Sequence, residues 1–210
     1  FCHVPVFVSG KMGNPDTALH AVASGEIDAV AMARPILADN EWARKVREGK
    51  IDDIRPCIGC HNGCFGRLTR GLNVSCALNP VSLQEDKYTL KPAETKKKIL
   101  VAGGGIGGME AARISALRGF DVELYEKTDR LGGTFRAAAA PDFKDDDKKL
   151  IAWYEKQMRD LSIPVHLSTP LTNDIVREKK ADVVILTTGA DKKRIPIPGF
   201  DGENVCDAKE

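Results

Sequence analysis

The sequence predicts an α/β protein with parallel strands, and three features of the chain support this fold class. Two strand-then-helix patterns follow each other closely between residues 4 and 48. A glycine-rich turn joins an apolar strand to a helix in the second half of the chain. Between them, at residues 55–80, apolar periodicity disappears and Cys, Gly and Asn dominate. The chain therefore contains two α/β parts, separated by a segment that needs a ligand to fold.

Length and composition are those of ordinary globular domains. The 210 residues are 42% hydrophobic and 29% charged, with a net charge of +1, which indicates no nucleic-acid or membrane partner. No apolar stretch reaches the roughly 20 residues that span a bilayer, and no signal peptide opens the chain, so we expect a cytoplasmic protein. Because Phe1 is not an initiator Met and the first residues already resemble a strand, we expect an internal fragment.

The first part is predicted from two strand–helix units. Its strands are expected at residues 4–8 and 28–32, and its helices at 14–25 and 39–48. Asn14 is a favourable N-cap and Pro15 a favourable first helical residue, while Asp39 or Asn40 can begin the second helix. A strand followed by a helix, twice over, is typical of a parallel sheet with helical crossovers.

Four cysteines are spaced as ligands of one metal centre. They are Cys57, Cys60, Cys64 and Cys76, in the run CIGCHNGC and eleven residues beyond it. One compact loop can offer three thiolates to a 4Fe-4S cluster while the returning segment supplies the fourth. Structural zinc also takes four cysteines, commonly as two separated C-x2-C pairs, so zinc and a loop without metal stay open. The other two cysteines have no such pattern and are expected to be free: Cys2 and Cys206.

The second part is predicted to be another parallel α/β unit. A polar, charged linker at residues 84–97 precedes it. Its strands are expected at residues 99–102, 121–126, 165–167 and 183–187, and its helices at 107–118 and 144–161. Apolar residues recur at helical spacing along the second helix, which indicates a core face.

The glycine-rich turn predicts a dinucleotide site. Gly103, Gly105 and Gly108 in VAGGGIGGMEAA satisfy G-x-G-x-x-G between a strand and a helix. The first glycine allows the tight turn, the second lets a pyrophosphate approach the backbone, and the third permits close helix–strand packing. Glu126 ends the next strand, 23 residues after Gly103, where its carboxylate can accept hydrogen bonds from a ribose. NAD and FAD both use this fingerprint, so the turn does not choose between them.

The order of motifs resembles that of one family of oxidoreductases. The motifs are AVAMARPILADNEW, then CIGCHNGC with Cys76, then VAGGGIGGMEAA and LTTGA. They are similar to those of the NADH:flavin oxidoreductase family of 2,4-dienoyl-CoA reductase, enoate reductase and trimethylamine dehydrogenase. Members combine an old-yellow-enzyme-type barrel carrying FMN, a 4Fe-4S cluster, and an FAD domain with an inserted NAD(P)H domain. Thr187 and His61 depart from residues that are frequent in the family, Ala and Asn.

The resemblance implies a domain plan and a set of cofactor-binding residues. Residues 1–54 would be the last strand–helix units of a TIM-type (β/α)8 barrel, 55–83 the cluster loop, 84–97 the linker and 98–210 a partial Rossmann-like FAD/NAD(P)-binding domain. The FMN phosphate would be held by Gly10, Lys11, Ala33 and Arg34, although Arg34 could instead form a surface salt bridge. The four cysteines would bind the cluster. The FAD site would comprise Gly103, Gly105, Gly108, Glu126, Gly132, Gly133 and Gly189.

The activity implied by the resemblance is an electron chain. NAD(P)H would reduce FAD, single electrons would cross the cluster, and reduced FMN would pass hydride to an activated alkene, such as an enoate or a dienoyl-CoA. The full-length protein would therefore act on a small molecule, and a homo-oligomer is left open. No catalytic residue is assigned to this chain, which is not expected to be active alone. The alternatives are an amine dehydrogenase of the same family and a zinc-stabilised, non-catalytic nucleotide-binding module.

Overall fold

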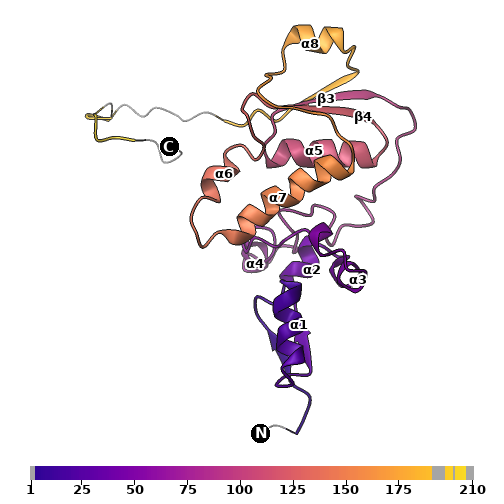
Figure 1. Ribbon diagram of the computed structural model, residues 1–210, viewed down its shortest axis with the longest axis vertical. Coiled ribbons are helices and arrows are strands. Elements are labelled where there is room, and N and C mark those ends of the chain that lie inside the picture. Colours follow the sequence, from indigo (N-terminus) through magenta and orange to yellow (C-terminus); the bar gives the residue numbers. More distant parts are fainter. Residues whose placement is uncertain (1–2, 191–196, 201, 207–210) are drawn as a thin grey trace. The chain divides into compact units, whose positions relative to one another are not determined.

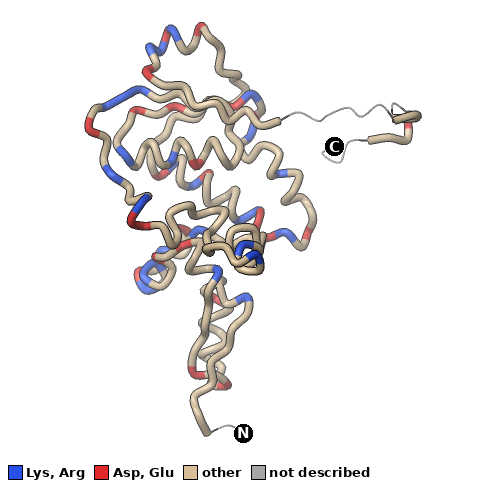
Figure 2. Tube along the Cα trace, turned by 180° about the vertical axis from the view of Figure 1, so that it is seen from behind, with Lys and Arg blue, Asp and Glu red and all other residues tan. Residues whose placement is uncertain are grey.

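The computed structural model describes residues 3–190, 197–200 and 202–206, and it divides the chain into two compact units (Figure 1). One unit ends at Thr89 and the other begins at Leu90. Each contains its own parallel β-sheet, so the mixed α/β class predicted from the sequence is confirmed. Basic and acidic residues are interspersed along both units (Figure 2). Cys2 lies outside the described residues.

The first unit begins with a β–α–β element. Strand β1 (Phe7–Ser9) pairs in parallel with β2 (Ala29–Ala31), with Phe7 opposite Ala29. Helix α1 (Pro15–Ala23) connects them. Its N-cap is Asn14, whose Oδ1 accepts hydrogen bonds from the N–H groups of Asp16 at 2.9 Å and Thr17 at 3.3 Å. The sequence-based start of this helix is therefore confirmed.

One helix lies within the range 39–48 where the sequence predicted a helix, and a short unpredicted helix precedes it. Helix α2 (Arg34–Ala38) precedes α3 (Trp42–Arg47), and the extended backbone of Asp39, with φ −145°, ends the first of them. Pro35 lies in the first turn of α2, where a missing N–H costs nothing. The prediction that a helix starts at residue 39 was therefore wrong, because the helix in this range begins at Trp42. A 3-10 turn (Ile51–Asp53) and helix α4 (Phe65–Leu68), neither of them predicted, follow.

Apolar side chains in the first unit are only partly covered. Ala18, Ala38, Trp42 and Leu78 are buried. By contrast, Val4, Phe7 and Leu19 are 65%, 68% and 69% exposed. Phe7 of β1, Leu19 of α1 and Val4 before β1 thus present apolar side chains to solvent.

The second unit is a four-stranded parallel sheet in the order β5-β4-β3-β6. The strands are β3 (Lys98–Ala102), β4 (Asp121–Tyr125), β5 (Val165–His166) and β6 (Val183–Leu186). The helices are α5 (Ile106–Leu117), α6 (Phe135–Ala138), α7 (Asp145–Asp160) and α8 (Asn173–Glu178). All four predicted strands and both predicted long helices are present within one or two residues, whereas α6 and α8 were not predicted.

Helix α5 packs against the strands on one side of this sheet, α7 packs against α5 on that same side, and α8 lies on the other side (Figure 1). Leu100 and Leu124 of the central strands are 0% exposed, as are Met109 of α5 and Leu150 of α7. This is the main core of the described chain. It places the turn between β3 and α5 at the carboxyl edge of the sheet, which is where ligands bind in open parallel sheets.

The segment that enters the second unit is attached to the end of α5. The carbonyl oxygen of Arg118 accepts a hydrogen bond from the Ala93 N–H at 2.8 Å, and Arg118 Nε donates to the Lys91 carbonyl at 3.1 Å. The Arg118 guanidinium also lies 5.2 Å from the centre of the Phe120 ring. Residues 91–93 therefore belong structurally to the second unit.

No helix in the described part of the chain is both long and apolar enough to cross a bilayer.

Candidate functional sites

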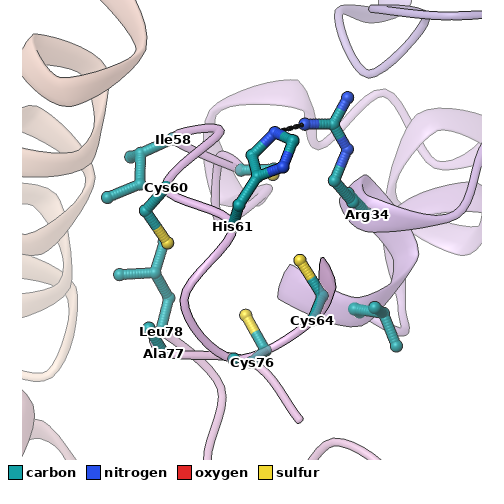
Figure 3. A pocket seen from close by; sticks show the side chains of 11 residues that line it. Arg34, Ile58, Cys60, His61, Cys64, Cys76, Ala77 and Leu78 are labelled. Atoms are coloured by element: carbon teal, nitrogen blue, oxygen red, sulfur yellow. Dashed lines mark hydrogen bonds between the residues drawn. The ribbon is translucent and has the colours of Figure 1, made fainter. Parts of the chain in front are cut away.

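A small pocket in the first unit is lined by all four predicted ligand cysteines (Figure 3). Its other lining residues are Arg34, Leu37, Ile58, His61, Gly63, Ala77 and Leu78. Cys64 is the N-cap of α4, whereas Cys76 comes from the segment that returns after this helix. In Figure 3 the thiols of Cys64 and Cys76 point into the same space. The structure thus brings together four cysteines that lie up to nineteen positions apart in the sequence.

The return of Cys76 depends on a glycine. The Ser75 N–H donates to the Gly63 carbonyl oxygen at 2.8 Å, and this bond holds the returning segment against the CIGCHNGC loop. A Cβ atom at Gly63 would lie 2.8 Å from the Ala77 nitrogen and 2.9 Å from the Cys76 carbonyl carbon. Such contacts are closer than carbon atoms tolerate, so any larger residue would push Cys76 away from the other three thiols.

The chemistry of the lining fits an iron–sulfur cluster. Four thiols are soft ligands, the remaining lining is largely apolar, and it includes neither Asp nor Glu. Among the residues that the structure describes, no group of three or more His, Cys, Asp or Glu side chains is arranged as the ligands of a single ion.

Charge and burial act in opposite directions on the first cysteine. Burial raises the pKa of the Cys57 thiol, and a hydrogen bond from the Gly59 backbone and the positive charge of Arg34 partly offset this increase. The Arg34 guanidinium lies within the same pocket, where its Nη1 is 2.6 Å from His61 Nε2. A cation beside a thiol favours the thiolate, which is the form that binds metals.

The predicted phosphate-binding residues lie at the carboxyl ends of β1 and β2. Gly10 and Lys11 follow β1 with positive φ angles of 115° and 51°, while Ala33 and Arg34 follow β2 at the N-terminus of α2. Because the strands are parallel, both loops lie at the same edge of the sheet. The partner of Arg34, His61, was not foreseen.

The glycine-rich turn is packed so tightly at Gly103 and Gly108 that side chains are excluded from these two positions. Gly103 has φ +107°, and a Cβ at Gly108 would lie 1.8 Å from the Gly103 carbonyl oxygen. The Thr187 hydroxyl closes the turn from β6, lying 2.8 Å from the Ala102 carbonyl and 2.9 Å from the Gly103 carbonyl. A Cβ at Gly105 would meet no atom within 4 Å. The turn thus leaves open space at the position where the motif lets a phosphate approach.

Glu126 is buried at 6% exposure, and it contacts the glycine-rich turn directly. Its Oε2 accepts a hydrogen bond from the Gly104 N–H at 2.6 Å, and its Oε1 accepts from the N–H and hydroxyl of Thr128 at 2.8 and 2.9 Å. Burial alone would raise the pKa of Glu126, but these hydrogen bonds outweigh it and lower the pKa below its usual value. The carboxylate therefore stays ionised and fixes the turn, a role that the sequence did not suggest.

The remaining predicted glycines divide into two groups. Gly132 and Gly133 lie against the turn: the Gly132 N–H donates to the Gly104 carbonyl at 2.8 Å, and a Cβ at Gly133 would be 3.1 Å from the Gly105 Cα. Gly189 follows β6 with φ +74° and has open space around it. Cys206, expected to be free, is an exposed free thiol.

Comparisons with known proteins match the second unit to a family model and the chain to two oxidoreductases. Residues 101–150 match a family model described as an NAD(P)-binding Rossmann-like domain. The chain is 44% identical to cinnamate reductase of Clostridium sporogenes over 94% of its own length and 30% of that protein. It is 37% identical to NADH oxidase of Thermoanaerobacter brockii over 96% of its length and 31% of that protein.

A solved structure is similar over almost the whole chain. The structure of 2-naphthoyl-CoA reductase in complex with 2-naphthoyl-CoA matches with a TM-score of 0.93 and 36% identity, covering 98% of this chain and 32% of that one. The chain thus spans less than a third of the length of each of these relatives.

Proposed function

We propose that this chain, which belongs to the family of 2,4-dienoyl-CoA reductase, enoate reductase and trimethylamine dehydrogenase, carries an iron–sulfur centre. The centre would belong to a longer flavin-dependent oxidoreductase. The observation that carries the proposal is the pocket shared by Cys57, Cys60, Cys64 and Cys76. When bound there, a 4Fe-4S cluster supplies single-electron transfer between two flavins. The chain's own residues bind it, shield it and position it.

The first unit supplies part of an FMN site in this proposal. Its two strand–helix units correspond to the end of a TIM-type barrel, and the two loops at their carboxyl edge would bind the phosphate. Lys11 and Arg34 provide positive charge there, and the N–H groups of Gly10 and Ala33 are further donors. The exposed side chains of Val4, Phe7 and Leu19 support the barrel assignment, because the earlier strands of a barrel would cover such a surface.

The second unit supplies part of an FAD site. Its turn offers backbone N–H groups at the start of α5, and Gly105 leaves room for a pyrophosphate. Oε2 of Glu126, which accepts one hydrogen bond from the Gly104 N–H, could accept a second from a ribose hydroxyl, whereas Oε1 already accepts two from Thr128. NAD(P)H would reduce this flavin in the full-length protein.

Reduction of an activated alkene is the activity that we favour for the full-length enzyme. The 44% identity to a cinnamate reductase supports an enoate-type substrate over an amine. The relative solved with an aromatic acyl-CoA is 36% identical, which supports a related thioester as the second candidate class. In either case electrons would pass from NAD(P)H through FAD and the cluster to FMN.

The metal content of the intact protein tests the proposal. After anaerobic purification we expect about four iron and four sulfide per chain, no stoichiometric zinc, and an EPR signal on reduction. Cys76→Ser should lower the iron content, whereas Cys206→Ser, which replaces an exposed thiol outside the pocket, should leave it unchanged. Stoichiometric zinc without sulfide would replace the electron-transfer proposal with the zinc-stabilised module.

The flavin content tests the two nucleotide sites separately. Lys11→Ala should lower the FMN content of the purified protein and leave the FAD content unchanged, because Lys11 lies at the edge of the first sheet only. Equal loss of both flavins would contradict the assignment of Lys11 to the FMN phosphate.

A further inference from the structure

We propose that Arg55 is a positioning residue that joins the two ends of the cysteine loop, residues 57–76, so that Cys57 and Cys76 are in place before iron arrives. The proposal rests on the proposed cluster. Arg55 lies two residues before Cys57, and Leu78 lies two residues after Cys76. Nη1 of Arg55 donates a hydrogen bond to the Leu78 carbonyl oxygen. One side chain therefore connects the start of the loop to its end.

The Arg55 side chain is buried, and its backbone is anchored as well. The residue is 6% exposed, and its N–H donates to Oδ2 of Asp39 at 2.8 Å. Asp39 is 5% exposed and also forms an ion pair with Lys45 at 2.6 Å. Burying a guanidinium costs free energy unless its hydrogen bonds are satisfied. The position of Arg55 is thus fixed by the connection between α2 and α3, outside the loop.

The other end of the loop is fixed to the same helices. Asn79 Nδ2 donates to the carbonyl oxygen of Leu37, in α2, at 3.1 Å. Leu37 and Leu78 both line the cysteine pocket, whereas Arg55 does not. Arg55 therefore acts on the pocket through the backbone that carries the cysteines, and not by contact with a bound group.

Closing the loop in advance has a direct physical effect on metal binding. Bringing the ends of a flexible loop together costs conformational entropy, which otherwise counts against the bound state. Arg55 joins the two ends of the loop, and the hydrogen bond from the Ser75 N–H to the Gly63 carbonyl holds the segment before Cys76 against the cysteine run. Less of the loop backbone therefore has to become ordered when the cluster binds. Without Arg55, Cys76 could move away from the pocket and expose the cluster to water and oxygen.

The test compares three variants of the intact protein: Arg55→Met, Arg55→Lys and Arg70→Met. The last replaces an exposed arginine in the same loop and serves as the matched control. Cluster loss is followed from the decay of its visible absorbance in the presence of an iron chelator, alongside the iron and sulfide content and the EPR spectrum of the reduced protein. Because a charged hydrogen bond is lost, Arg55→Met should lose its cluster about tenfold faster or more than the unaltered protein.

The conservative variant separates positioning from general loss of stability. Arg55→Lys keeps a charged donor, so its rate of cluster loss and its EPR line shape should be close to those of the unaltered protein. Arg70→Met should lose its cluster at the same rate as the unaltered protein. If Arg55→Met does not accumulate, Asp39→Asn tests the proposal in its place. This variant weakens the hydrogen bond that anchors the Arg55 backbone, so it should lose its cluster faster than the unaltered protein, although less than tenfold faster. Equal loss rates in the variants and the unaltered protein would overturn the proposal. Unaltered protein without iron and sulfide would instead overturn the cluster itself, and this inference with it.

Discussion

Replacing Glu123 by Gln should remove a large part of the acid sensitivity of the second unit. The Glu123 side chain in β4 is 7% exposed and receives hydrogen bonds or ion pairs from four donors. These are Lys98 at 2.9 Å, Lys179 at 3.0 Å, Tyr125 at 2.9 Å and His166 at 2.8 Å. Burial by itself would raise the pKa of Glu123, but the four donors outweigh it and lower the pKa from 4.5 to about 2.

The size and direction of the effect follow from linkage. A carboxyl with a lower pKa in the folded chain than in the unfolded chain stabilises folding above the unfolded pKa, and this stabilisation disappears as the pH falls. For Glu123, lowering the pKa from 4.5 to about 2 corresponds to about 3 kcal/mol at neutral pH. The contribution should decline as the pH falls from 4.5 towards 2.

The assay is urea-induced unfolding at several pH values, followed by tryptophan fluorescence. The chain has two tryptophans, and Trp42→Phe leaves Trp153 of α7 as the reporter of the second unit. Glu123→Gln should be less stable at neutral pH, and its curve should meet that of the parent near pH 2. Asp174→Asn replaces a side chain that is 92% exposed, so it should change neither the stability at neutral pH nor its dependence on pH appreciably. A Glu123→Gln curve that runs parallel to the parent curve through this range would refute the reasoning.

Three further predictions concern residues around the two sites. Gly108→Ala should destabilise the second unit by about 1–3 kcal/mol, as measured by urea unfolding, because the added Cβ would collide with the turn. The control is the neighbouring Gly107→Ala, which should be neutral or stabilising by up to about 1 kcal/mol because a Cβ there meets no atom. Gly63→Ala should lower the iron and sulfide content of the anaerobically purified intact protein and leave FAD bound, which metal and flavin analysis would show. Thr187→Val should cost about 1 kcal/mol of stability, and Thr187→Ser should restore most of it; an unchanged urea midpoint in Thr187→Val would contradict the role of the hydroxyl.

Local signals in the sequence were sufficient for most of the second unit. The apolar strand ending at Ala102, the glycine-rich turn and the helix after it follow from short patterns whose physics is local. The short helix α8 was missed although Thr172 caps it, with its hydroxyl accepting from the Ile175 N–H at 3.4 Å. Six residues carry too little apolar periodicity to stand out from a loop.

The first unit shows what spacing alone does not reveal. The cysteines were found from their spacing, and the structure places them around one pocket. The contacts that hold the pocket together join residues without any shared pattern, such as Arg34 with His61 and Arg55 with Leu78. Asp39 was expected to start a helix because acidic residues are good N-caps, but its carboxylate is used by Lys45 and by the Arg55 N–H. Tertiary hydrogen bonds thus override a local preference.

The attachment of residues 91–93 to the end of α5 has a practical consequence for dividing the protein. A protease that cuts near Thr89 would leave a C-terminal fragment in which the Arg118 carbonyl still has its partner, the Ala93 N–H. A fragment that begins at Lys98, where β3 starts, would lack both Lys91 and Ala93. The end of α5 would then face water, and we expect the shorter fragment to melt at a lower temperature than the longer one.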